Sequence, residues 1–195
     1  MKKARIAVLV SGGGTNLQAL LDAQKIGILQ SGEIVLVVSH NPKAYALTRA
    51  EKAGVRQLVL TGDDFEARLE KVLRDAEIDL IILAGFMRIL SKDFTMRWPK
   101  RILNIHPALI PAFCGQGFYG LRVHEAALER GVKVTGATVH FVNEIPDGGE
   151  IILQKAVAVQ PGDTPEVLQR RVMEEAEWIL LPQAAELVSK GVKQS

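Results

Sequence analysis

The segment LNIHPALIPAF, residues 103–113, places an amide and an imidazole where a buried strand is expected to end. Asn104 and His106 are two residues apart, so an extended backbone presents both side chains on one face. Pro107 and Pro111 then interrupt regular structure, which keeps the following chain from covering that face. An amide and an imidazolium directed at one point can stabilise the oxyanion of a tetrahedral intermediate. The alternative is a polar pair that only satisfies backbone groups at a strand end.

A glycine-rich segment, SGGGTN at residues 11–16, also follows a predicted strand and precedes a helical pattern. Its backbone N–H groups can approach a ligand closely, and the polar side chains can donate at the start of the helix, which favours an anion such as phosphate. It is not a Walker A motif, since no Gly-Lys-Ser/Thr follows, and Leu17 replaces the third glycine of the dinucleotide fingerprint. A turn that binds nothing is the alternative. The predicted monophosphate site comprises Gly12, Gly13, Gly14, Thr15 and Asn16.

Two further segments could complete such a site. Asp147 lies in EIPDGGEI, at the tip of a predicted hairpin, where Asp-Gly is also an ordinary turn signal. If the hairpin folds back toward His106, the carboxylate would stabilise the imidazolium and raise the pKa of His106.

The segment AGFMRILS, residues 84–91, is too apolar for a loop that faces only water. It is either a turn packed in the core or one wall of a pocket for a flat heteroaromatic ligand.

The elements that must position these residues alternate between strand and helix. Short apolar runs at 4–10, 33–39, 56–60, 78–85 and 101–106 predict strands, and three of them are continuously apolar over four to six residues, as expected when helices cover both faces of a parallel sheet. Helical spacing occurs at 15–30, 43–53 and 64–76. After residue 132, two strands joined by a turn predict a hairpin. A helix of about 25 residues follows, with Asp163 or Thr164 as N-cap and Pro165 at its first position.

This order predicts an α/β fold with a doubly wound, mostly parallel open sheet, helices on both faces, and a C-terminal antiparallel hairpin plus long helix. In such sheets, ligands bind beyond the carboxyl ends of the strands. The segments SGGGTN, GFMRIL and NIHPALIP each follow a predicted strand end, so they should meet at one edge of the sheet.

Length and composition restrict the class of protein. The chain has 195 residues, of which 48% are hydrophobic and 24% charged, with a net charge of +2 and no run of like charges. This predicts one domain with no nucleic-acid or membrane partner. Cys114 alone cannot form an internal disulfide, which fits a cytoplasmic protein, and it has no evident base beside it. The other histidines, His40, His124 and His140, lack metal-type spacing, so no metal is predicted.

Several segments together resemble the phosphoribosylglycinamide formyltransferase family of folate-dependent enzymes in purine synthesis. They are VLVSGGGTNLQALL, LAGFMRIL, LNIHPALIPAF and GATVHFVNEIPDGG, in that order, and the resemblance extends over about residues 5 to 190. It implies transfer of the formyl group of 10-formyltetrahydrofolate, as co-substrate, to the primary amine of glycinamide ribonucleotide. It also implies one domain over 1–195, with a nucleotide-binding half (1–100) and a catalytic and folate-binding half (101–195), acting as a monomer or homodimer.

The resemblance also implies roles for individual residues. Asn104, His106 and Asp147 match the catalytic trio of the family, with Asn104 also near the folate. Glu177 matches an acidic contact to the ribonucleotide substrate. The glycine loop matches the phosphate site, and the segment that matches the folate site comprises Met87, Arg88, Ile89 and Leu90.

The sequence departs from the motifs of the family at two places. Two other functions are also compatible with the predicted site residues. An arginine that the family commonly carries before the third helix is not evident in LTGDDFEARLE, and the loop FCGQGFYG is longer than usual. A formyltetrahydrofolate hydrolase would share the same trio. A non-catalytic phosphometabolite-binding protein would explain SGGGTN but gives no reason for Asn104 and His106.

Overall fold

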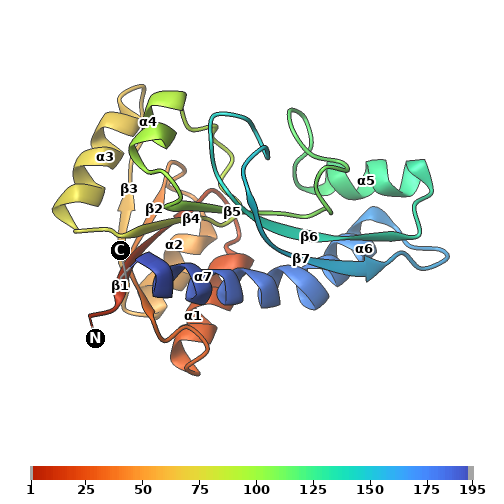
Figure 1. Ribbon diagram of the computed structural model, residues 1–195, viewed down its shortest axis with the longest axis horizontal. Helices are drawn as coiled ribbons and strands as arrows, with labels where there is room; N and C mark the ends of the chain where they lie inside the picture. Colours follow the sequence, from red (N-terminus) through yellow and green to blue (C-terminus); the bar gives the residue numbers. More distant parts are fainter. Residues whose placement is uncertain (1, 193–195) are drawn as a thin grey trace.

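The computed structural model describes residues 2–192, and within them all strands belong to one seven-stranded sheet with the order β3-β2-β1-β4-β5-β6-β7 (Figure 1). Neighbouring strands from β3 to β5 are parallel, whereas β6 pairs antiparallel with β5 and with β7. The predicted fold class is therefore confirmed. The strands are β1 (Ala4–Val10), β2 (Gly32–Ser39), β3 (Arg56–Val59), β4 (Leu80–Leu83), β5 (Ile102–His106), β6 (Val134–Phe141) and β7 (Ile151–Ala158).

Helices cover both faces of this sheet. In Figure 1, α7 runs beneath the sheet on the same side as α1 and α2, while α3 and α4 lie on the opposite side. The helices are α1 (Thr15–Lys25), α2 (Tyr45–Lys52), α3 (Phe65–Asp75), α4 (Lys92–Arg97), α5 (Leu121–Arg130), α6 (Pro165–Val172), a π-helical segment η1 (Met173–Glu177) and α7 (Trp178–Val192). No helix among the described residues is long and apolar enough to cross a membrane.

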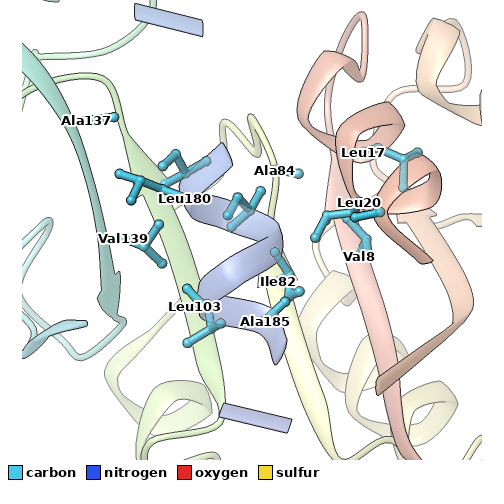
Figure 2. Close-up of a cluster of buried hydrophobic side chains, with 14 of the residues drawn as sticks. Val8, Leu17, Leu20, Ile82, Ala84, Leu103, Ala137, Val139, Leu180 and Ala185 are labelled. Atoms are coloured by element: carbon cyan, nitrogen blue, oxygen red, sulfur yellow. The ribbon is translucent and has the colours of Figure 1, made fainter. Parts of the chain in front are cut away.

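The core consists of two layers because successive side chains of a strand point to opposite faces. Ile6 and Val8 of β1 pack in the layer with α1 and α7, while Ala7 and Leu9 pack in the layer with α3 and α4. Figure 2 shows part of the first layer, where Leu180 of α7 lies beside strand residues of the sheet. The continuously apolar strands of the sequence are thus buried on both sides, as expected for a parallel sheet.

The structure corrects the sequence reading at several element ends. The strand expected at 78–85 is shorter, and helix α1 ends before 30 because Gly27 has a left-handed φ of 80°. The predicted long C-terminal helix begins with Thr164 as N-cap, whose hydroxyl accepts from the Val167 N–H, but η1 interrupts it. Helices α4 and α5 were not predicted; α5 lies after the segment read as a glycine-rich loop.

The hairpin of β6 and β7 requires a glycine where its two strands approach. A Cβ atom on Gly136 would lie 2.0 Å from the backbone oxygen of Lys155 on β7. Gly136→Ala is therefore expected to lower the free energy of unfolding by roughly 1–3 kcal/mol, measured by urea denaturation. Gly191→Ala is the control, because that Cβ would meet no side chain or backbone of another element within 4 Å, and it is expected to be neutral or stabilising. Equal effects of the two substitutions would contradict the steric argument.

Candidate active site

A cavity of about 760 Å³ lies at the carboxyl ends of β1, β4 and β5. Its lining includes the glycine loop after β1, the segment Gly85–Ile89 after β4, and Asn104 and His106 at the end of β5. The expected meeting of three strand-end segments is confirmed. Among the described residues, no group of three or more His, Cys, Asp or Glu side chains is arranged to hold a metal ion.

Asn104, His106 and Asp147 lie together in this cavity. Asn104 Nδ2 is 3.5 Å from Asp147 Oδ1, and His106 Nδ1 is 3.5 Å from Asp147 Oδ2. Asp147 comes from the turn between β6 and β7, so the hairpin does fold back onto the end of β5. The amide, imidazole and carboxylate can therefore act on one reacting group.

The turn that carries Asp147 has a special backbone. Asp147 has a left-handed φ of 56°, which Asp tolerates better than most residues. A Cβ on Gly149 would lie 1.7 Å from the Phe141 carbonyl oxygen, so only glycine allows this close return of the chain. The Asp-Gly-Gly sequence therefore forms a turn and also presents a carboxylate to the cavity. The interpretation as an ordinary turn signal and the interpretation as a carboxylate that acts on His106 do not exclude each other.

The charge on His106 is governed mainly by burial, which lowers its pKa because the imidazolium loses hydration. The Asp147 carboxylate and the Phe113 carbonyl oppose this effect but do not outweigh it. The predicted effect of Asp147, which raises the pKa of His106, is therefore present, but burial outweighs it. The Nε2–H of the ring donates to the Phe113 carbonyl at 2.8 Å.

The carboxylate of Asp147 remains ionised near neutral pH. Burial raises the pKa of Asp147, but the His140 and His106 rings, when protonated, and the Gly115 N–H together bring it below its usual value. The Gly115 N–H donates to Asp147 Oδ2 at 2.8 Å. The backbone of the segment 113–115 therefore contacts both His106 and Asp147.

His140 fixes the orientation of the Asn104 amide. His140 Nδ1 lies 2.8 Å from the Phe141 carbonyl oxygen, so it carries the proton and Nε2 is an acceptor. Nε2 is 3.2 Å from Asn104 Nδ2, which therefore donates toward His140. From the sequence, His140 was excluded only as a metal ligand; the antiparallel pairing of β5 and β6 places it directly opposite Asn104.

The glycine loop is shaped by helix α2. Gly14 has a φ of 72°, and a Cβ there would lie 2.5 Å from the Ala46 side chain. The Ala46 N–H donates to the Gly12 carbonyl at 3.0 Å, and Arg49 Nε donates to the Gly13 carbonyl at 2.8 Å. Both of these bonds are accepted by carbonyl oxygens of the loop, and neither of them uses a loop N–H group. The predicted phosphate residues Gly12, Gly13, Gly14, Thr15 and Asn16 all line the cavity.

Glu177 also lines the cavity, from the π-helical segment η1, and it is almost completely buried. Asn16 Nδ2 donates to its Oε2 at 2.6 Å, so the start of α1 is joined to the C-terminal helix. Burial raises the pKa of Glu177 to about 7, with the Asn16 hydrogen bond acting in the opposite direction. π-Helical turns are frequent at functional sites because they redirect one side chain.

Glu177 makes the stability of the fold depend on pH. A carboxyl whose folded pKa is raised above its usual 4.5 destabilises the protein progressively as pH rises from 4.5 to about 7. Glu177→Gln is therefore expected to stabilise the chain by on the order of 3 kcal/mol above this range, and less near its lower end.

Urea unfolding at about pH 5 and about pH 8 would measure this difference. Glu175→Gln, at an exposed neighbour in the same segment, is the control for loss of one negative charge. A Glu177→Gln effect that does not depend on pH would contradict the assignment of the raised pKa.

The predicted folate segment is divided between cavity and core. Met87, Arg88 and Ile89 line the cavity, and the Met87 N–H donates to Ser11 Oγ at 2.8 Å. Leu90, predicted with them, lies instead in the hydrophobic core against the α3–α4 layer. The Arg88 guanidinium lies 4.5 Å from the centre of the Phe65 ring.

Sequence reasoning missed part of the lining. The segment Gly115–Gly120 contributes a continuous wall, and Pro146, His124, Gln169 and Met173 complete it. The glycines of FCGQGFYG were a signal for the first. For the residues on α5 and α6 no local signal existed, because only the packing of these helices brings them to the cavity.

An open α/β sheet with a glycine loop in one part of a cavity and an Asn-His-Asp cluster in another has the groups needed to bind an anion and to donate hydrogen bonds to a developing oxyanion. Comparison with known proteins then gives the family. Residues 4–184 match the family described as formyl transferase, and the chain belongs to this family.

Individual relatives agree with this result. Phosphoribosylglycinamide formyltransferase of Haemophilus influenzae is 41% identical over 197 residues, covering 98% of this chain and 89% of the relative. The human trifunctional purine biosynthetic protein adenosine-3 is 45% identical over 199 residues, covering 99% of this chain. This chain spans only 19% of that protein. A crystal structure of glycinamide ribonucleotide transformylase 1 from Symbiobacterium toebii has a TM-score of 0.89 at 45% identity, covering 97% of this chain and 89% of its own.

Proposed function

We propose that the chain transfers the formyl group of 10-formyltetrahydrofolate to the primary amine of glycinamide ribonucleotide, which gives formylglycinamide ribonucleotide and tetrahydrofolate. The observation that carries this proposal is the convergence of Asn104, His106 and Asp147 in a cavity that also contains the glycine loop. The names of the relatives with the highest coverage support the acceptor, and the family supports the formyl group.

In the proposed reaction, the amine attacks the formyl carbon and the carbonyl oxygen gains negative charge. Asn104 and a protonated His106 would donate hydrogen bonds to this oxyanion. Both donors have other partners in the structure, since His106 Nε2 donates to Phe113 and Asn104 Nδ2 is directed at His140 and Asp147. The intermediate would replace one of these partners on each side chain.

The tetrahedral intermediate then collapses with transfer of one proton. The attacking nitrogen loses a proton, the bond from carbon to the folate nitrogen breaks, and that nitrogen receives a proton. Asp147 is the nearest ionised carboxylate to His106, at 3.5 Å, and would relay this proton through water. It would also favour the charged form of His106 as the oxyanion develops.

The two halves of the chain would supply different parts of the active site. Residues 1–100 would supply the glycine loop for the substrate phosphate, and residues 101–195 would supply the catalytic trio and Glu177. The proposed folate-binding segment Met87–Ile89 belongs to the first half, so folate binding is not confined to 101–195 as expected. We further propose that the protein acts in the cytoplasm on small molecules alone, as a monomer or homodimer.

A formyl-transfer assay on the purified chain tests the proposal. The assay contains 10-formyltetrahydrofolate with glycinamide ribonucleotide, and a second tube omits the ribonucleotide. Formation of formylglycinamide ribonucleotide only in the first tube supports the proposal. Formate release in the second tube would instead indicate a hydrolase; a formyltetrahydrofolate deformylase from Pseudomonas syringae shares the fold at 24% identity. No product in either tube would contradict both functions.

A further inference from the structure

His124 is a buried histidine beside the active site that the proposed reaction does not use. It lies on α5 with no exposed surface, and neither Nδ1 nor Nε2 has a hydrogen-bond partner among the described residues. Folded proteins leave few buried polar atoms unpartnered, because each one loses its hydration without compensation. A buried ring with two unpartnered nitrogens therefore requires an explanation.

The position of the ring indicates what kind of partner is missing. His124 belongs to the wall of the main cavity, together with Gln169, Met173 and Glu177 of the α6–η1 segment. It is close enough to His106 for the charge there to lower its pKa. A second unpartnered polar atom, Asn16 Oδ1, belongs to a residue of the same wall. The cavity therefore has unsatisfied polar groups on α1 and on α5.

The protonation state of His124 restricts the kind of ligand group that the ring could bind. Burial, with a smaller contribution from His106, lowers the pKa of His124 to about 4, so the ring is neutral near pH 7. A neutral imidazole offers one N–H donor and one acceptor nitrogen. Hydroxyl and carboxamide groups match this pair, because each can donate and accept at once. A phosphate cannot use the acceptor nitrogen without carrying a proton itself.

We propose that His124 is a binding residue for the acceptor substrate and forms hydrogen bonds with a hydroxyl or carboxamide between its phosphate and its reacting amine. This inference depends on the proposed function, since it assigns a part of the acceptor to a part of the cavity. The ring belongs to the cavity wall but has no exposed surface, so contact with the substrate requires a shift of the neighbouring wall. The segment before α5 contains Gly115, Gly117 and Gly120, all with positive φ, and it borders the cavity.

Calorimetric titration of glycinamide ribonucleotide into the wild type and His124→Phe tests the proposal without the formyl donor. Phenylalanine keeps an aromatic ring at this position and removes both unpartnered nitrogens. We expect the Kd of the ribonucleotide to rise ~10- to 100-fold and the Kd of inorganic phosphate, as a second probe, to stay unchanged. The thermal unfolding midpoint should stay equal or rise, because a buried unpartnered polar group has been replaced with an apolar one.

A structural histidine would behave differently. An unchanged ribonucleotide Kd in His124→Phe would overturn the proposal, and so would a lower unfolding midpoint with equal loss of ribonucleotide and phosphate affinity. His124→Gln, which keeps one donor and one acceptor, should recover part of the ribonucleotide affinity. If the wild type itself does not bind glycinamide ribonucleotide, the proposed function fails. If the wild type binds and both variants bind equally well, only the role of His124 fails.

Discussion

Replacing His106 with alanine is expected to lower the turnover of formyl transfer by ~100- to 1,000-fold, the usual effect of removing one donor to an oxyanion. The imidazole is the titratable donor at the end of β5, and Asp147 lies 3.5 Å from its Nδ1. Turnover is measured with both substrates saturating, so that a loss in kcat is separated from weaker binding.

The fold of His106→Ala must be checked in parallel, because the ring is 4% exposed and donates to the Phe113 carbonyl. His106→Asn keeps a donor at this position and provides the matched comparison. Both variants should bind inorganic phosphate as the wild type does, since the glycine loop belongs to a different segment. Turnover equal to that of the wild type in His106→Ala would contradict the proposed role.

The sheet and the position of the site were predictable from local pattern. β1 and β4 could be placed because their apolar runs are continuous, which occurs when helices cover both faces. The site followed from the rule that ligands bind beyond the carboxyl ends of parallel strands. Asn104 and His106 were recognisable because the alternation of a strand places both on one face.

The remaining parts of the site depend on contacts between distant segments. The approach of Asp147 to His106 is decided by the length and twist of the β6–β7 hairpin, and the position of His124 is decided by the packing of α5. The π-helical segment η1 is one such feature, because its extra width has no signature in residue spacing. The net pKa of His106 also could not be predicted, because burial is a property of the fold and not of the neighbouring residues.

Asp147→Asn is expected to lower turnover by roughly 100- to 10,000-fold, the range for loss of a positioned acid or base. The carboxylate opposes the effect of burial on His106, so its removal lowers the pKa of His106 further. The charged form of the ring would then exist only at lower pH. The descending limb of turnover against pH, which reports loss of the imidazolium, should move to lower pH in the variant.

NMR titration of the His106 ring in the wild type and in Asp147→Asn measures the pKa change directly. Asp93→Asn, at an exposed carboxyl near the start of α4, controls for the loss of one negative charge. The His106 midpoint should fall in Asp147→Asn and remain in place in Asp93→Asn. A midpoint that does not move in Asp147→Asn would show that the 3.5 Å approach carries no electrostatic coupling. The loss of turnover would then have to come from the proton relay alone, because that role does not require Asp147 to act on the charge of His106.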